Sequence, residues 1–176
     1  MAISRTHRFD TDRLRALVRK HYAGLVDDPT RGRTARHGIE FACGGLGYPR
    51  EALEALPPSA VERFAGIGNP FRGARLVPGQ TVVDLGCGSG VDLLIAAGKV
   101  GRDGLAYGVD ITPEMCLEAA SNGFLAGVSD HVEIRLGSIE RLPLDDACAD
   151  VVIANGVFNA VADKAAGLRE VRRVLK

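Results

Sequence analysis

No run of 18 apolar residues occurs in this sequence of 176 residues, and its start, MAISRTHRFD, contains no apolar signal region. A membrane-spanning helix needs about 20 apolar residues, and a secretory signal needs an apolar stretch near the start. The four cysteines also lack the C-x-x-C spacing that is typical of zinc sites and thioredoxin-type centres. We therefore expect a cytoplasmic protein with reduced thiols, without a bound metal and without a membrane partner.

An excess of one charge is missing as well, because 22 basic residues balance 22 acidic ones. Arg31, Arg33 and Arg36 have no interleaved aromatic residues, so nucleic acid is not an expected partner. The charges are nevertheless divided: residues 1–76 carry 13 basic and 8 acidic side chains, and residues 77–176 carry 9 and 14. We interpret this division as docking of a basic segment on an acidic body. A surface for an anionic ligand and two solvated faces are the alternatives.

What the sequence does contain is typical of a folded domain, with 46% hydrophobic and 25% charged residues and a length that fits one domain. The pattern of residue types along the chain changes near Arg75. Before this point, Gly and Pro interrupt short segments; after it, apolar runs alternate with amphipathic ones. We therefore divide the chain into an N-terminal lid of helices and loops, residues 1–75, and a core, residues 76–176.

The lid begins with an amphipathic helix over about 12–25, for which Asp10 or Thr11 is available as the cap. Its apolar side chains recur at i, i+3 and i+4: Leu14, Leu17, Val18, Tyr22 and Leu25. Residues 27–49 contain seven Gly or Pro and predict a loop. Short helices are expected at 49–56 and 59–64.

In the core, strands alternate with helices. Short apolar runs predict strands at 81–85, 105–110, 132–136 and 150–155. Helical patterns occupy 91–100, 113–126 and the segment that follows Asp163, where Leu168, Val171, Val174 and Leu175 share a face. This alternation predicts an α/β fold, a Rossmann-like, doubly wound parallel sheet with helices on both faces.

The strongest chemical signal is the stretch Asp84-Leu-Gly-Cys-Gly-Ser-Gly90, which directly follows the first strand. Glycines at alternate positions let the backbone approach a ligand closely, and their N–H groups together with the following helix N-terminus form a polar cradle. Asp110 ends the second strand, where an acid can accept hydrogen bonds from a ribose diol. A tight strand-to-helix turn without a ligand is the alternative.

The spacing of the glycines selects among nucleotide-binding families. The G-x-G-x-x-G fingerprint of NAD and FAD sites would require glycine where Val91 stands, and no GKS or GKT follows as a P-loop requires. The D-x-G-x-G-x-G pattern instead resembles motif I of the class I S-adenosylmethionine-dependent methyltransferases. GSIERLP and the segment after it resemble later motifs of that superfamily. VRKHYAGL, LGYPREAL and IGNP (67–70) resemble one of its branches, the arsenite methyltransferases.

The resemblance implies contacts between the cofactor, S-adenosylmethionine, and a set of residues on both sides of residue 75. These are Tyr22, Asp84, Gly86, Gly88, Gly90, Asp110, Ile111, Met115, Ser138, Ile139, Glu140 and Asn155. It implies that the glycines pack against the methionine and ribose part, that Asp84 lies near the amino group and that Asp110 holds the ribose hydroxyls. Further contacts would be made with adenine by Ile111, Met115 and the 138–140 turn, with the methionine end by Asn155, and from the lid by Tyr22. Plain packing is the alternative for Ile111, Met115 and Tyr22.

The sequence departs from the arsenite branch at its cysteines. Ile67 and Gly156 stand where that branch has cysteine, and Cys43 is the one possible counterpart of a substrate-binding thiol. Trivalent arsenic needs several soft thiolate ligands, so the departures count against arsenic as the substrate. The other cysteines are more simply packing residues. His21 and His37 lie in the lid, where surface or packing roles are favoured, and we assign no catalytic residue.

The relatives' sheet has seven strands, whereas four are expected here. A fragment, a split enzyme completed by a second chain, or a homodimer that covers the open sheet edge would each explain the difference, and we favour a C-terminally incomplete chain. The function expected from the sequence is methyl transfer from S-adenosylmethionine to a small-molecule acceptor. The alternatives are a non-catalytic S-adenosylmethionine-binding or assembly subunit and an arsenite methyltransferase.

Overall fold

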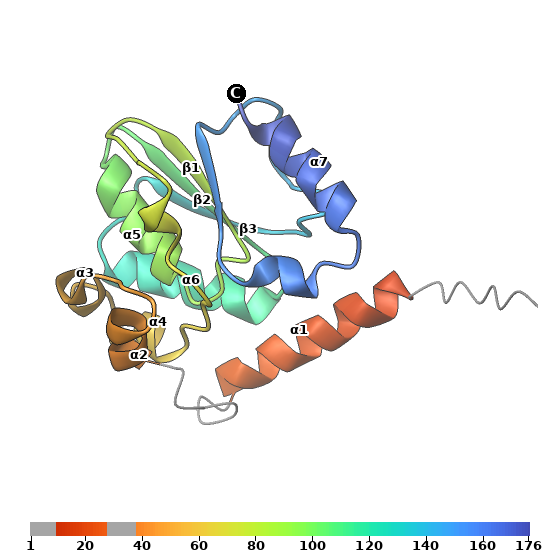
Figure 1. Ribbon diagram of the computed structural model, residues 1–176, viewed down its shortest axis with the longest axis horizontal. Helices are drawn as coiled ribbons and strands as arrows, with labels where there is room; N and C mark the ends of the chain where they lie inside the picture. Colours follow the sequence, from red (N-terminus) through yellow and green to blue (C-terminus); the bar gives the residue numbers. More distant parts are fainter. Residues whose placement is uncertain (1–9, 28–37) are drawn as a thin grey trace, which may run out of the picture.

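The computed structural model describes residues 10–27 and 38–176 (Figure 1). A parallel sheet with the strand order β3-β2-β1-β4 lies at its centre. The strands are β1 (Thr81–Leu85), β2 (Leu105–Asp110), β3 (Val132–Leu136) and β4 (Val151–Ala154). The sequence prediction of a Rossmann-like parallel sheet is confirmed, with the first three strands at the expected residues and β4 one residue shorter at each end.

Helices cover both faces of the sheet. On one face lie α5 (Val91–Val100) and α6 (Pro113–Leu125), and α7 (Lys164–Val174) lies on the other (Figure 1). The first face buries Val82 and Ala106 of the sheet against Leu93 and Ala97 of α5. The second buries Val83, Leu85 and Val109 against Val174 and the segment that follows β3. Strand residues therefore alternate between two apolar cores, as the pleat of a strand requires.

Helix α7 begins as expected, because the Asp163 carboxylate accepts a hydrogen bond from the Ala166 N–H at 2.9 Å. Its predicted apolar face is wrong at one position, because Leu168 is 60% exposed. Val174 is buried as predicted, and Gly167, which was not predicted, is buried with it. After α7 the chain approaches the start of β4, where Leu175 forms a parallel bridge with Ala149.

The N-terminal segment packs on the core from two directions. Helix α1 (Thr11–Asp27) is capped by Asp10 and contacts α6. The short helices α2 (Gly38–Gly44), α3 (Arg50–Glu54) and α4 (Pro58–Glu62) lie against α5 (Figure 1). The loop predicted over 27–49 is therefore wrong at α2, where Ala42 is fully buried and fixes a helical turn that the flanking glycines disfavour. None of the described helices is long and apolar enough to cross a membrane.

Candidate functional site

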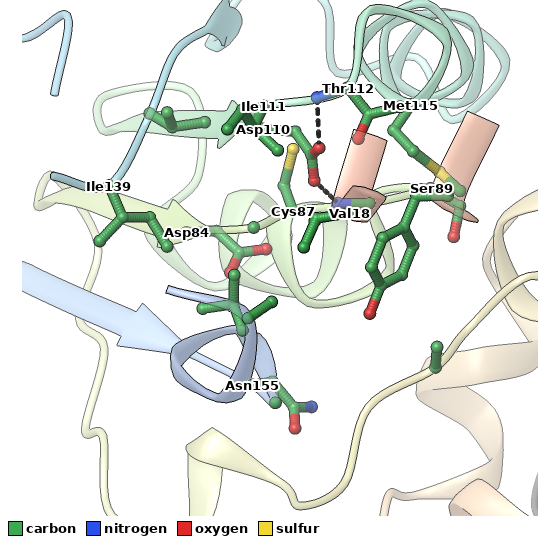
Figure 2. A pocket seen from close by; sticks show the side chains of 18 of the residues that line it. Val18, Asp84, Cys87, Ser89, Asp110, Ile111, Thr112, Met115, Ile139 and Asn155 are labelled. Atoms are coloured by element: carbon green, nitrogen blue, oxygen red, sulfur yellow. Dashed lines mark hydrogen bonds between the residues drawn. The ribbon is translucent and has the colours of Figure 1, made fainter. Parts of the chain in front are cut away.

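A cavity opens at the carboxyl ends of the strands, where ligands bind in open α/β sheets (Figure 2). Together with the solvent-filled space at its mouth, it has a volume of about 1090 Å³. Ends of strands, the glycine turn, α1 and the segment after α4 all contribute to its lining. The sequence-predicted residues that line it are Tyr22, Asp84, Gly86, Gly88, Asp110, Ile111, Met115, Ser138, Ile139, Glu140 and Asn155.

The three glycines of the turn have positive φ values, but their surroundings differ. Gly86 (φ +68°) sits against Val157, so a Cβ built on it would lie 2.7 Å from the Val157 Cβ. Gly88 (φ +53°) faces the cavity, and no described heavy atom lies within 4 Å of a Cβ built on it. Gly90 (φ +97°) is outside the cavity lining and lies close to Ala119 of α6, at the start of α5. The turn therefore combines one open ligand-facing position with two packing positions.

Asp110, at the end of β2, is held by the glycine turn (Figure 2). Its Oδ2 accepts a hydrogen bond from the Gly88 N–H at 3.0 Å, and its Oδ1 accepts one from the Thr112 N–H at 2.9 Å. Burial raises the pKa of this carboxyl, and the two N–H groups counteract the rise by stabilising the charged form. Each oxygen of a carboxylate has two lone pairs, so Asp110 can still accept from two ligand hydroxyls.

The turn after β3 forms another wall of the cavity. Ser138 and Glu140 line it through side chains that are hydrogen-bonded to each other, Ser138 Oγ to Glu140 Oε2 at 3.0 Å. Burial raises the pKa of Glu140, but hydrogen bonds from the Asp163 N–H, Arg15 and Ser138 outweigh it, so the net pKa is lowered. Glu140 is therefore a fixed negative charge at the edge of the cavity.

Helix α1 lies over the cavity and is fastened at two points. Arg15 Nε donates to Glu140 Oε2 at 2.8 Å, and Arg19 Nε donates to the carbonyl oxygen of Ile111 at 3.1 Å. Val18, which lies between these two arginines, and Tyr22, which follows Arg19 on the same helix, line the cavity. Burial, and then the charge of Asp110, raises the pKa of Tyr22, so its hydroxyl stays protonated at neutral pH. Tyr22, one of the regularly spaced apolar residues of the predicted helix, thus faces the cavity from α1.

The part of the cavity lining formed by β1 and the start of α5, which we call the deep wall, contains two buried carboxyl groups, Asp84 and Asp92. Burial raises the pKa of Asp84 well above its usual range, and Asp92 and Asp110 raise it further. Asn155, after β4, donates to Asp92 Oδ2 at 2.8 Å, and Tyr48 donates to Asp92 Oδ1 at 2.6 Å. The sequence reasoning missed Asp92 and Tyr48, because an acid in the first turn of a helix and a tyrosine in a loop have common structural explanations.

The cysteines do not gather at the cavity. Cys43, predicted as a substrate ligand, is not part of the lining and packs with the helices of the N-terminal segment. Cys87 is the one cysteine in the lining, and burial followed by the charge of Asp84 raises the pKa of its thiol. Ile67 and Gly156 are neighbours, because a Cβ built on Gly156 would lie 3.5 Å from Ile67 Cγ1. The two positions at which the arsenite branch has cysteine and this chain does not are therefore adjacent in the structure.

Of His21 and His37 in the lid, the structure describes one. His21 is exposed on α1 and is not part of the lining. His37 lies outside the described residues. Among the described residues, no three His, Cys, Asp or Glu side chains are arranged to hold a metal ion.

Comparison with known proteins identifies the family. The family described as "Methyltransferase domain" matches residues 76–176, which is more than half of the chain. The chain belongs to the class I S-adenosylmethionine-dependent methyltransferases. The methyltransferase fold expected from the glycine turn and Asp110 is thereby confirmed.

Relatives of this methyltransferase domain include arsenite methyltransferases. The chain is 34% identical to the arsenite methyltransferase from Halobacterium salinarum, over 95% of this chain and 46% of the relative. It is 36% identical to the one from Aquipseudomonas alcaligenes over 90% of this chain and 46% of the relative. An arsenic(III) S-adenosylmethionine methyltransferase from Chlamydomonas reinhardtii has a similar structure, with a TM-score of 0.65 and 38% identity over 72% of this chain and 44% of that one. The chain spans about half the length of these relatives.

Proposed function

We propose that this methyltransferase domain binds S-adenosylmethionine in the cavity at the strand ends and directs its methyl group to a small-molecule acceptor. The observation that carries the proposal is the pairing of Gly88 with Asp110. The space beside Gly88 is open, and the Gly88 N–H fixes the Asp110 carboxylate at the end of the neighbouring strand. Together these two features suit a ribose in close contact with the backbone.

The other lining residues fit the same cofactor. Ile111, Met115 and Ile139 offer apolar surface for an adenine ring, and Asp110 offers acceptors for the ribose hydroxyls. The acidic deep wall, with Asp84 and Asp92, suits the positively charged methionine end. S-Adenosylmethionine would supply a methyl group on a sulfonium, which is already electrophilic. The protein then needs mainly to orient the acceptor and exclude water, and α1 with Val18 and Tyr22 lies where it could do both.

We propose an acceptor other than trivalent arsenic, although the relatives above are named arsenite methyltransferases. A soft metalloid centre requires several thiolates. Cys87 alone lines the cavity, with a raised thiol pKa, and Ile67 beside Gly156 offers no sulfur. These residues favour a carbon, nitrogen, oxygen or single-thiol nucleophile on a small organic molecule.

Calorimetric titration with S-adenosylmethionine and S-adenosylhomocysteine tests cofactor binding. The wild type should bind both, and Asp110→Ala should weaken both about tenfold or more, because the hydroxyl contacts are lost from a buried site. Asp145→Ala, which removes an exposed carboxylate outside the cavity lining, is the matched control and should bind like the wild type. Equal affinities for Asp110→Ala and the wild type would contradict the proposal.

A transfer assay separates an enzyme from a non-catalytic cofactor-binding subunit. The protein is incubated with S-adenosylmethionine labelled in its methyl group and a small-molecule extract, with and without added arsenite. We expect label in an organic product and no increase with arsenite. Labelled methylarsenic would overturn the acceptor proposal.

A further inference from the structure

The serine between the last two glycines of the turn, Ser89, is held by contacts that the cofactor roles described above do not use. It is 4% exposed and lines the cavity (Figure 2). Its Oγ donates to the Ala60 carbonyl oxygen of α4 at 2.8 Å, and its own carbonyl oxygen accepts from Nδ2 of Asn122 in α6 at 2.8 Å. Two helices outside the glycine turn therefore fix the backbone between Gly88 and Gly90.

Asn122 is the residue that joins these two helices. It lies on the buried side of α6 and is 1% exposed. Its Oδ1 accepts a hydrogen bond from the Ser59 hydroxyl of α4 at 2.5 Å, while its Nδ2 donates to the Ser89 carbonyl oxygen. A primary amide carries an acceptor and a donor on one planar group, which suits a hydroxyl on one side and a carbonyl on the other. Asn122 thus links α4 to the glycine turn through a single side chain.

Burial makes this cluster selective for one conformation of the turn. A buried polar group that loses its hydrogen bond destabilises the conformation that contains it. Asn122 and Ser89 are both buried, so a turn conformation that moves Ser89 away from Asn122 leaves a carbonyl and an amide without their partners. The cluster therefore favours the conformation in which the Gly88 N–H donates to Asp110.

The contact between α4 and α6 continues to the cavity. Arg63, directly after α4, lines the cavity and forms an ion pair with Glu118 of α6. On the same helix, Ala119 packs on Gly90, and Met115 lines the cavity. A displacement of α4 from α6 would therefore disturb both the glycine turn and the cavity wall next to it.

We propose that Asn122 and Ser59 are positioning residues that transmit the docking of α4 to the glycine turn, and so raise the affinity for the cofactor without touching it. This inference rests on the proposed function and gives a role to two residues that do not line the cavity. When only a fraction of the molecules has the binding-competent turn, the apparent affinity falls in proportion to that fraction. The coupling is reciprocal, so the bound cofactor must in turn stabilise α4 on α6.

Calorimetric titration of single and double variants with S-adenosylmethionine tests the coupling. Ser59→Ala removes the α4 end of the cluster and should weaken binding about three- to tenfold, and Asn122→Ala should weaken it about tenfold or more. Added to Asn122→Ala, Ser59→Ala should have no further effect, because its contact runs through Asn122. Equal weakening by Ser59→Ala in both backgrounds, or wild-type affinity in both single variants, would overturn the inference.

Two controls separate positioning from a general loss of stability. Ser121→Ala removes an exposed hydroxyl next to Asn122 on α6 and should bind S-adenosylmethionine like the wild type. Val100→Ala removes buried apolar volume at the far end of α5, so it should lower the urea midpoint without weakening binding. A loss of affinity in Val100→Ala as large as that in Ser59→Ala would show that stability alone governs binding, and would overturn the inference.

Hydrogen exchange measures the reciprocal effect in α4, and it needs only Ser59→Ala if Asn122→Ala does not fold. Saturating S-adenosylmethionine should slow exchange at the amides of Ala60 and Val61, which lie outside the cavity lining, in the wild type. The slowing should be several-fold smaller in Ser59→Ala at the same saturation, and equal slowing in both proteins would overturn the inference alone. A wild type that binds no S-adenosylmethionine would overturn the proposed function together with it.

Discussion

Alanine at Gly86 and at Gly88 should separate packing from ligand contact within one turn. Both glycines have positive φ, so each substitution costs about 1 kcal/mol in backbone strain. At Gly86 the new Cβ would also lie 2.7 Å from the Val157 Cβ, an overlap that adds about 1–3 kcal/mol. At Gly88 the new methyl group meets no described atom within 4 Å and enters the cavity. Stability and binding should therefore respond in opposite order.

Urea unfolding and calorimetric titration measure the two effects. We expect Gly86→Ala to lose about 2–4 kcal/mol of unfolding free energy and Gly88→Ala about 1 kcal/mol. Gly88→Ala should nevertheless bind S-adenosylmethionine at least about tenfold more weakly, because its methyl group occupies ligand space. Wild-type affinity in a folded Gly88→Ala protein would refute the placement of the cofactor. Equal stability losses would refute the packing argument for Gly86.

Arg15→Gln removes the partly exposed ion pair that holds α1 to Glu140, so it should change stability little. We expect cofactor dissociation to be about threefold faster or more in stopped-flow measurements. An unchanged dissociation rate would argue against a covering role for α1. Burial raises the pKa of Asp84, and a bound cation should lower it, so calorimetry in buffers of different ionisation enthalpy should record more proton release on binding by the wild type than by Asp84→Asn. Equal release by both proteins would assign the proton elsewhere. The pKa of Glu140 is lower in the folded protein than in the unfolded chain, so ionised Glu140 stabilises the fold. This stabilisation is complete above the unfolded pKa of about 4.3 and is lost as the pH falls through the pKa of the folded state. Acid unfolding of Glu140→Gln should therefore be less steep below about pH 5, and an identical acid limb would contradict the assignment.

The core could be predicted closely from the sequence because its signals are local. The runs at 81–85 and 105–110 are mainly apolar, and 132–136 alternates apolar and charged residues. Each run ends at or just before a glycine or an acid, so pattern and turn chemistry agree on the same boundaries. The segment 38–44 was not predictable, because its glycines disfavour a helix and its support comes from burial of Ala42 against residues distant in the sequence. Leu168 fits the helical period of α7 but lies outside the contact made by the helix, which periodicity cannot reveal.

The site was predictable where a motif specifies the backbone and less so where side chains meet across the fold. Gly88 and Asp110 follow from spacing along the chain, and they are hydrogen-bonded as that spacing suggests. Gly90 belongs to the same motif, yet it packs on Ala119 instead of lining the cavity. The contacts that join Tyr48, Asp92 and Asn155 depend on how α5, β4 and the N-terminal segment pack together. No local pattern encodes such a meeting.

Binding of the cofactor over the glycine turn is the central claim, and amide NMR spectra recorded during titration with S-adenosylmethionine test it most directly. We predict saturable shifts of the backbone amides of Gly86, Gly88 and Ile111, which lie around the cavity, and no comparable shift at exposed Asp145. Saturable shifts confined to residues away from the cavity, with the amides of the glycine turn unchanged, would contradict the account.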